Sequence, residues 1–501
     1  MDMSSNGIWY YCGTGALALI IAVFIVKRRN VRLPPGPFAL PLLGHLHLLQ
    51  PNLHEWLSTL SNKYGPLMTL KFGMKTSIVV SSSAMAKEIL KDNDQTFANR
   101  VVPVVARCFA YDGSDILWSP YGPKWRFLRK ICAKELFSAK SMETLHPLRR
   151  EEVHRTIGDI YRDSVNGISV DVGAKAFATS FNLITNMMWS KNGERVLEFK
   201  DLMAEELDVW SIPNLSDLFP FLERLDVQGL YRRMQKVFVK LDGLFDRIIQ
   251  ERVKGESEGN DFLQLLLHLV NRAVVEEDDM GFQLTLRDVK ALILDMVSGS
   301  TETTSSTVEW AMAELLQNPE IMKRAQEELK QAVGLDHRVE ESHLSRLPYM
   351  DAIVKETLRL HPTVPLLVPH SPDKTCQISG YVIPKGAEIM INVWKIQRNP
   401  EVWKNPLVFD PERFMQDPHK WEYNGREFDY IPFGSGRRIC AGISMATRMV
   451  HYTLASLLHS FDWSLQSGEK VDMSEKFGFV MHKAVPLVAI PKPRLSQAQL
   501  Y

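Results

Sequence analysis

The chain has few cysteines and no excess of charge of either sign. Its 501 residues contain 5 cysteines, and 59 lysines and arginines balance 59 aspartates and glutamates. Five scattered cysteines without a CxxC pair cannot build a disulfide scaffold, and they make a cysteine-rich zinc site improbable. Chains that coat phosphate backbones normally carry a basic excess, so no nucleic-acid partner is expected.

The sequence also lacks internal repeats and low-complexity tracts. Hydrophobic residues make up 45% of the chain, and 11 Trp, 23 Phe and 13 Tyr exclude a disordered or fibrous protein. Apolar residues recur at spacings of three and four from about residue 54 to residue 333, which favours helices. The chain is therefore predicted to be mainly α: a single large α-rich domain with a minor β region.

One uncharged apolar run is long enough to cross a membrane, and it lies at residues 8–26. As a helix its 19 residues span roughly 28 Å, close to a bilayer core of about 30 Å. Basic residues follow the run from Lys27, whereas a cleaved signal peptide carries them before its apolar segment. The positive-inside rule then predicts a single-pass anchor with the rest of the chain in the cytosol.

A proline-rich stretch follows, beginning with Leu33-Pro34-Pro35-Gly36-Pro37. Proline fixes φ and lacks a backbone donor, so the stretch is a stiff, non-helical connector. It is either a generic linker or a hinge that sets the angle of the domain on the membrane. The predicted parts are a signal anchor with a basic stop at 1–30, a hinge at 31–45 and a folded domain at 46–501.

Local signals place several elements of that domain. The sequence Thr285-Leu286-Arg287-Asp288 resembles a capping box and predicts a 33-residue helix that ends at Gln317. A second helix is predicted from Tyr349 to Leu360. The runs 376–383 and 387–394 have the composition of strands, and Pro384-Lys385-Gly386 between them predicts a hairpin or small sheet.

The strongest chemical signal is Phe-Gly-Ser-Gly-Arg-Arg-Ile-Cys-Ala-Gly at 433–442. Its glycines allow the backbone to approach a planar ligand, and an apolar helical pattern begins after Gly442. Cys440 is therefore expected just before a helix N-terminus, where free N–H groups and the helix dipole stabilise a thiolate. A lone cysteine is more often a small buried hydrophobic residue than a ligand. The residues around Cys440 favour the ligand interpretation.

Phe433, Gly436, Arg438, Cys440 and Gly442 match F-x-x-G-x-R-x-C-x-G. With this pattern the chain resembles the cytochrome P450 superfamily of heme-thiolate monooxygenases, specifically the plant microsomal members of specialised metabolism. The resemblance covers nearly the whole chain. It implies a heme-thiolate catalytic domain, an endoplasmic reticulum membrane location, and heme b whose iron has Cys440 as its axial ligand.

The resemblance also implies how the enzyme is supplied. O₂ and NADPH-derived electrons are the cosubstrates, and no GxGxxG fingerprint for a flavin or nicotinamide occurs in the chain. A separate NADPH-dependent flavoprotein reductase is therefore expected as a partner. Arg126, Lys130 and Lys134 share a helix face that is either a solvated surface or a docking site for an acidic partner.

Two sets of residues take roles only through the resemblance. Glu356, Arg359 and Arg413, in ETLR and PERF, would form a buried structural network behind the cysteine loop; alone, the first two would be an ordinary helix-surface pair. The expected heme-binding residues besides Cys440 are Trp125, Arg129, His370, Arg438, Phe433 and Gly434. Among them, Arg129, Arg438 and His370 would bind the propionates.

The predicted central helix carries Gly299-Ser300-Thr301-Glu302-Thr303-Thr304, small and polar residues that are unfavourable inside a helix. One interpretation is that the hydroxyls bond back to helix carbonyls and bend the helix. The other is the family's oxygen-binding groove, in which Glu302 and Thr303 relay protons. Ser300 departs from the glycine that the family usually has there.

By family position, the substrate pocket is expected to include Phe109, Val297, Val364, Leu366 and Phe479. These side chains are apolar, so a hydrophobic small molecule is expected, with terpenoids and flavonoid-type phenolics as the leading classes. Two alternatives are a heme-thiolate dehydratase or isomerase of hydroperoxides and a non-catalytic membrane scaffold. The acid–threonine pair and the unexpanded cysteine loop argue against the first.

Overall fold

A computed structural model describes residues 32–111, 113–190, 193–210, 212–255, 261–272, 282–417, 419–466 and 470–501. The predicted anchor at 1–30 lies outside the described residues. Within them, no helix is long and apolar enough to cross a membrane. The described part of the predicted hinge packs on the domain, because Thr69 N donates to Pro35 O at 2.8 Å.

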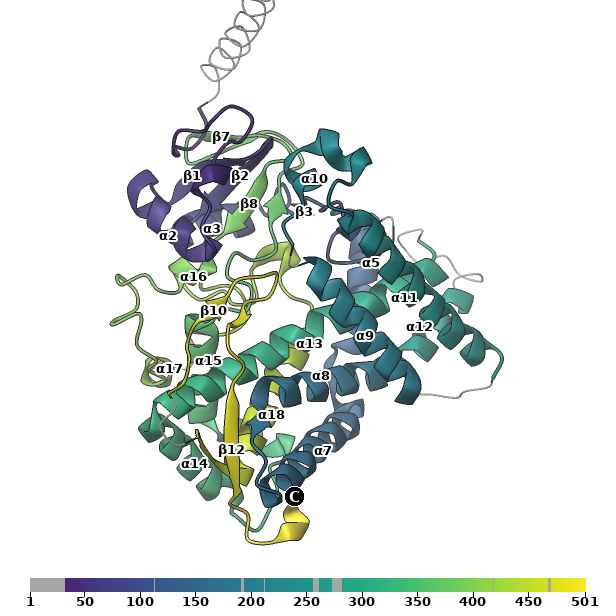
Figure 1. The fold of residues 1–501 in the computed structure, drawn as a ribbon, viewed down its shortest axis with the longest axis vertical. Coiled ribbons are helices and arrows are strands. Elements are labelled where there is room, and N and C mark those ends of the chain that lie inside the picture. The colour runs from purple at the N-terminus through teal and green to yellow at the C-terminus, as the bar shows by residue number, and fades with distance from the viewer. Residues whose placement is uncertain are drawn as a thin grey trace, which may run out of the picture.

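Most of the described chain is helical, which confirms the predicted mainly α fold (Figure 1). The long helix α13 (Leu286–Gln317) runs through the centre and packs on α8 (Val172–Trp189), α15 (Pro348–Leu360) and α18 (Ile443–Ser460). The capping box predicted for α13 is present: Asp288 N donates to the Thr285 hydroxyl, and Thr285 N donates to the Asp288 carboxylate.

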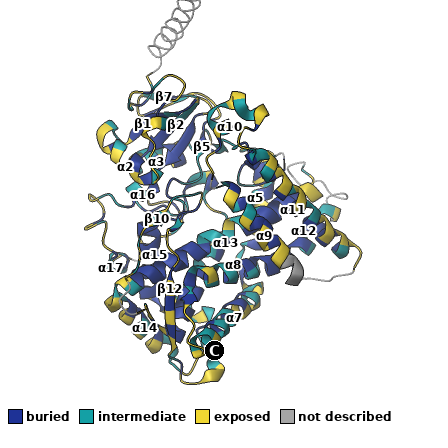
Figure 2. Ribbon diagram, viewed as in Figure 1, coloured by how far each residue is buried: buried dark blue, intermediate teal, exposed yellow. Residues whose placement is uncertain are grey.

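The remaining α-helices surround this centre. They are α2 (Leu53–Tyr64), α3 (Ser83–Lys87), α4 (Ala106–Phe109), α5 (Pro123–Ile131), α6 (Ala139–Thr144), α7 (His146–Val165), α9 (Gly193–Trp210), α10 (Leu215–Leu218), α11 (Leu230–Val253), α12 (Phe262–Arg272), α14 (Pro319–Val333), α16 (Val393–Ile396) and α17 (Glu412–Met415). Short helices of 3₁₀ or π type, η1–η7, lie at Leu46–Leu48, Glu88–Asp92, Cys132–Leu136, Pro220–Leu225, Glu341–Arg346, Gly436–Arg438 and Ala498–Leu500. The apolar faces of the α-helices form one large buried core, seen as dark blue ribbon in Figure 2.

A five-stranded sheet forms the main β region, with the order β1-β2-β8-β5-β3. Its strands are β1 (Leu67–Phe72), β2 (Lys75–Val80), β3 (Asn99–Arg100), β5 (His370–Ser371) and β8 (Glu388–Ile391). Smaller sheets pair β4 (Val170–Asp171), β12 (Val488–Pro493) and β9 (Phe461–Ser464), then β6 (Cys376–Ile378) with β7 (Tyr381–Ile383), and β10 (Glu475–Lys476) with β11 (His482–Lys483).

Two local predictions were wrong. The helical pattern assigned to 54–333 contains the hairpin β1–β2, whose turn is at Gly73 with φ of 59°. The runs 376–383 and 387–394 do not form a hairpin with each other. The first run is itself the hairpin β6–β7, turning at Gly380 with φ of 79°, whereas β8 pairs in parallel with β2 in the main sheet.

Candidate functional site

The cysteine loop is held in one shape by its backbone. Cys440 lies two residues before Gly442, the N-cap of α18, close to the helix N-terminus as the sequence predicts. Cys440 N donates to Phe433 O at 3.1 Å. Gly434 and Gly436 have φ of 74° and 71°, a region that favours glycine. A Cβ on Gly436 would also lie 2.1 Å from Leu90 O, so no other residue fits there.

Cys440 is exposed by surface area, although many protein atoms surround its thiol. Burial raises the pKa of the Cys440 thiol, while the Gly442 N–H and the positive charge of Arg129 act to lower it. The expected stabilising groups are therefore present, but burial outweighs them in the protein alone.

Two arginines lie over the ring of Trp125, which is buried on α5. The guanidinium carbon of Arg438 is 4.5 Å and that of Arg129 5.9 Å from the ring centroid. Trp125 Nε1 donates to Ile116 O at 2.9 Å, and Arg129 Nη2 donates to Ile439 O at 2.5 Å. The structure thus brings Trp125, Arg129 and Arg438 together beside the cysteine loop.

A further arginine, Arg100, belongs to the same cluster and was missed by sequence reasoning. It pairs directly with His370 across β3 and β5, and no motif marks it. Its Nε is buried without a hydrogen-bond partner, and burial and the charge of Arg438 lower its pKa. His370 Nδ1 bonds to Phe97 O at 2.8 Å, and burial lowers the pKa of His370 as well.

These donors fit a heme. Arg100, Arg129 and Arg438 are cations whose pKa burial lowers, and Asp115 is the carboxylate whose charge acts on Arg438. Such a cluster is stabilised by an anionic ligand, and a heme offers two propionate carboxylates together with an iron that binds thiolates. The buried, unpartnered Nε of Arg100 is the observation that most directly calls for such a ligand.

The middle of α13 has an accessible face in an otherwise buried helix. Four residues of this face are exposed or half-buried: Asp295, Gly299, Glu302 and Thr303. The last three follow Asp295 by four, seven and eight residues, so all four lie on one side of the helix. Thr303 Oγ1 donates to Gly299 O at 2.9 Å, and Ser300 Oγ donates to Met296 O at 2.7 Å. The hydroxyls thus bond back to the helix, on a face that protein atoms cover only in part.

Glu302 has one close charged neighbour among the described residues. His482 Nε2 on β11 lies 3.3 Å from Glu302 Oε2. Glu206 on α9 is buried, and burial, together with the charge of Glu302, raises its pKa to about 8. The acid of the predicted relay therefore lies between a histidine and a second carboxyl group.

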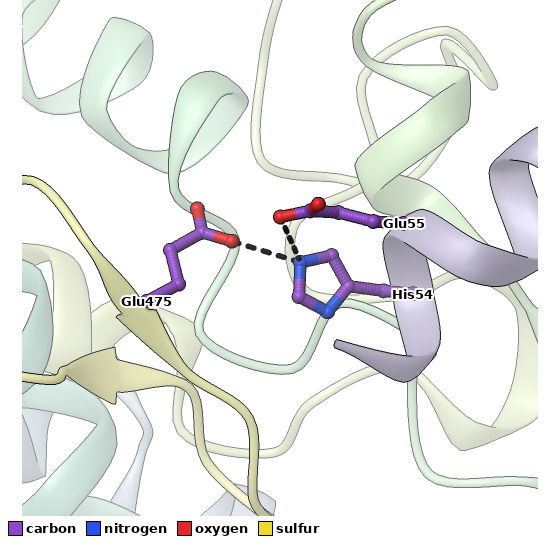
Figure 3. Close-up of side chains that lie close together, drawn as sticks. All are labelled: His54, Glu55 and Glu475. Atoms are coloured by element: carbon purple, nitrogen blue, oxygen red, sulfur yellow. Dashed lines mark hydrogen bonds and ion pairs between the residues drawn. The ribbon is translucent and has the colours of Figure 1, made fainter. Parts of the chain in front are cut away.

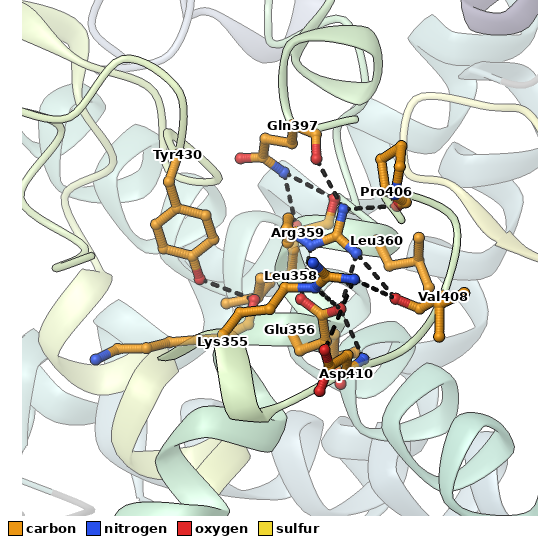
Figure 4. A network of polar contacts seen from close by, with 12 residues as sticks. Lys355, Glu356, Leu358, Arg359, Leu360, Gln397, Pro406, Val408, Asp410 and Tyr430 are labelled. Carbon is orange, nitrogen blue, oxygen red and sulfur yellow. Dashed lines mark hydrogen bonds and ion pairs between the residues drawn. The ribbon is translucent and has the colours of Figure 1, made fainter. Parts of the chain in front are cut away.

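Glu356, Arg359 and Arg413 come together in a buried network. Figure 4 shows Glu356 and Arg359 at its centre. Arg359 binds Glu356 through Nε at 2.6 Å and Nη2 at 2.8 Å, with both side chains fully buried. Arg359 Nη1 also donates to Gln397 O at 2.9 Å. Gln397 Oε1 in turn accepts from Ile431 N at 3.1 Å, so the network reaches the start of the cysteine loop.

The five residues expected in the pocket lie in different surroundings. Phe479 is partly exposed and its ring lies 6.2 Å from that of Trp118 and 5.6 Å from that of Trp210. Phe109 and Val297 belong to the main helical core, and Val364 is half-buried. Leu366 packs with side chains of β1 and β2 in a separate core. Their contact with substrate stays a prediction.

A family model described as "Cytochrome P450" matches residues 34–488. The chain belongs to the cytochrome P450 family. It is 41% identical over 488 residues to a geraniol 8-hydroxylase of Swertia mussotii, covering 95% of this chain and 97% of that one. It is 39% identical over 501 residues to a flavonoid 3'-monooxygenase of Petunia hybrida, covering 97% and 96%.

A solved zebra fish cytochrome P450, determined with progesterone, has the same fold. It superposes with a TM-score of 0.76 at 26% identity, covering 89% of this chain and all of that one. The chain is thus a heme-dependent monooxygenase of the kind found in plant specialised metabolism. It uses heme-thiolate iron, O₂ and NADPH-derived electrons delivered by a reductase.

Proposed function

We propose that this P450 hydroxylates a hydrophobic terpenoid or flavonoid-type phenolic metabolite, with Cys440 as the iron ligand. Nearly full-length similarity to a geraniol 8-hydroxylase and a flavonoid 3'-monooxygenase supports these classes. The single observation that carries the proposal is Cys440, exposed by surface area, beside Arg129 and Arg438, whose guanidinium groups lie over Trp125. The aromatic group of Trp118, Trp210 and Phe479 supplies apolar surface suited to such ligands.

Each predicted residue then has a distinct task. Cys440 would hold the iron, and Arg100, Arg129 and Arg438 would hold the propionates, with Phe433, Gly434, Trp125 and His370 completing the binding site. When bound, the heme supplies the oxygen chemistry. Glu356, Arg359 and Arg413 would keep the cysteine loop in place, and Glu302 and Thr303 would supply protons at the accessible face of α13.

Substrate-induced spectral shifts test the substrate class. Purified full-length protein is titrated with a panel of monoterpene alcohols and flavonoids, and the Soret band is followed. We expect saturable shifts for at least one of these two classes, because an apolar ligand displaces water near the iron. If neither class produces a shift in a heme-loaded protein, and small polar compounds do, the proposed substrate class is wrong.

Membrane attachment forms part of the proposal. The anchor at 1–30 would cross the endoplasmic reticulum membrane, the hinge at 31–45 would connect it, and the domain at 46–501 would face the cytosol. Exposed apolar side chains support a membrane-facing surface: Phe38, Leu42, Leu43, Met74, Phe221, Leu225 and Val227. Hydrogen bonds from Gly73 N to Leu43 O and from Met74 N to Leu218 O hold these segments side by side.

Deletion of residues 1–30 is expected to release the protein from membranes without loss of heme, since no described core residue is removed. Release will require salt or mild detergent if the apolar surface touches lipid. Adding Phe221→Ser and Leu225→Ser should then make the protein soluble without either. Heme content and sedimentation with membranes are measured together. Loss of heme on truncation would place the segment inside the fold instead.

Thr303→Ala is expected to lower product formed per NADPH and to raise hydrogen peroxide. The change removes a hydroxyl from the accessible face of α13, while heme and substrate binding should stay as they are. Ser300 and Thr304 lie nearby, so the loss should be partial, well short of the ~10²-fold or more that a sole proton donor can contribute. Product, peroxide and NADPH are counted in one assay. Full coupling in Thr303→Ala and in Ser300→Ala/Thr303→Ala would exclude the role given to Thr303.

A further inference from the structure

We propose that His482 is a positioning residue for Glu302. It holds the Glu302 carboxylate in the orientation from which protons reach Thr303, and so favours product over peroxide. The proposal rests on the monooxygenase function and on the proton supply proposed above. His482 carries no motif in the sequence, and only the fold brings it to the central helix.

The two side chains form an ion pair at the edge of the accessible face of α13. His482 Nε2 lies 3.3 Å from Glu302 Oε2, and the side chains are 35% and 18% exposed, respectively. His482 is therefore the more exposed member of the pair. Without a partner, the flexible Glu302 side chain would sample several rotamers, and the contact with His482 limits this freedom.

The hairpin that carries His482 is aligned along α13. Ser306, one helical turn after Glu302 and on the same face, donates through Oγ to Met481 O at 2.8 Å. Met481 N donates to Thr363 O at 2.8 Å. Since Ser306 contacts the residue immediately before His482, the register that pairs His482 with Glu302 is fixed on both elements.

The other strand of the hairpin is fixed by Glu475. Its carboxylate lies 2.8 Å from His54 Nε2 on α2, as Figure 3 shows, and 3.6 Å from His361 Nδ1. Burial alone would raise the pKa of Glu475, but its bonds to His361 and His54 hold that pKa well below the usual range. The ionised carboxylate thus ties β10 to two separate parts of the domain, and His482 on β11 has little freedom to move.

A second acid near Glu302 makes this restraint useful. Burial raises the pKa of Glu206 on α9 to about 8, so Glu206 becomes ionised only as the pH rises toward that value. Repulsion between the two carboxylates would then turn the Glu302 side chain away. His482 offers a partner from a different element, and the pair is an ion pair when the imidazole is protonated. It therefore stabilises the orientation of Glu302 in which Oε2 faces His482.

The first test compares His482→Leu with Lys476→Leu, which removes an exposed cation directly opposite on the paired strand. An ion pair of this exposure changes the ratio of two side-chain populations by a factor of about two to five. The ratio of peroxide to product should therefore rise by that factor in His482→Leu and stay unchanged in Lys476→Leu. His482→Gln, which can still hydrogen-bond to the carboxylate, should restore most of the coupling. Substrate-induced spectral shifts should be the same in all variants.

The second test asks whether His482 acts through Glu302. In a Glu302→Gln background, His482→Leu should change coupling no further. Carbethoxylation of His482 is followed by peptide mass spectrometry and does not depend on turnover. It should be faster in Glu302→Gln, because a neutral amide holds Nε2 less strongly than the carboxylate does. This readout also decides the matter if His482→Leu does not fold.

Additive effects of the two substitutions, together with unchanged carbethoxylation, would overturn the proposal. Coupling of His482→Leu equal to that of the wild type would do the same. Failure of the proposed function looks different, because the wild-type protein itself would then give no hydroxylated product.

Discussion

Cys440→Ser is expected to abolish the strongly red-shifted Soret band of the reduced CO complex and all monooxygenation. Serine offers no thiolate, and the axial thiolate is what makes this iron an oxygen-activating centre. The Arg100, Arg129 and Arg438 cluster remains, so the variant should still take up some heme. Heme content by extraction and the CO spectrum are measured on the same sample.

Cys376→Ser is the matched control, since Cys376 is a half-buried cysteine of the hairpin β6–β7. It should keep both the CO spectrum and activity. A red-shifted CO spectrum in Cys440→Ser equal to that of the wild type would assign the iron to another ligand and end the heme-thiolate role of Cys440.

Arg359→Leu is expected to give little folded, heme-loaded protein. The substitution leaves Glu356 fully buried with its main partner removed, which costs about 3–5 kcal/mol. That is a large part of the ~5–15 kcal/mol by which domains are stable. It also frees the carbonyls that Arg359 binds on the segment before the cysteine loop.

The measurements are thermal unfolding and heme per protein, with leucine at the exposed Arg426 as the control. Replacing Glu356 and Arg359 together by Gln and Leu should restore part of the lost stability, because no uncompensated charge then stays buried. If Arg359→Leu unfolds at the wild-type temperature with full heme content, the network does not support the cysteine loop.

The sequence predicted those parts of the molecule that depend on local spacing. The capping box at Thr285 sets the start of α13, and Gly442 ends the cysteine loop where α18 begins. Pairings between distant segments have no such signal. The run after Gly386 leaves its expected partner because β8 adds to β2, more than 300 residues away in the chain, and period-2 alternation does not specify a partner.

The site residues likewise differ in how far the sequence marks them. Cys440, Glu356 and Arg359 lie in compact motifs, whereas Arg100 and His482 reach the site only because their segments pair as strands. The polar run of α13 illustrates a different limit. Its hydroxyls bond back to helix carbonyls, as one of the two interpretations expects, yet the same turn forms the accessible face that the other interpretation requires. The two readings of that segment are compatible in the fold.

Turnover under dioxygen labelled with the heavy isotope ¹⁸O shows whether the protein is a monooxygenase. The full-length protein is combined with an NADPH-dependent reductase and a substrate that gives a spectral shift, and the product is weighed by mass spectrometry. For a monooxygenase we expect a hydroxylated product with one ¹⁸O atom per new hydroxyl group, formed only when reductase and NADPH are present. Product whose new oxygen comes from water, or a rearranged hydroperoxide formed without reductase, would contradict it.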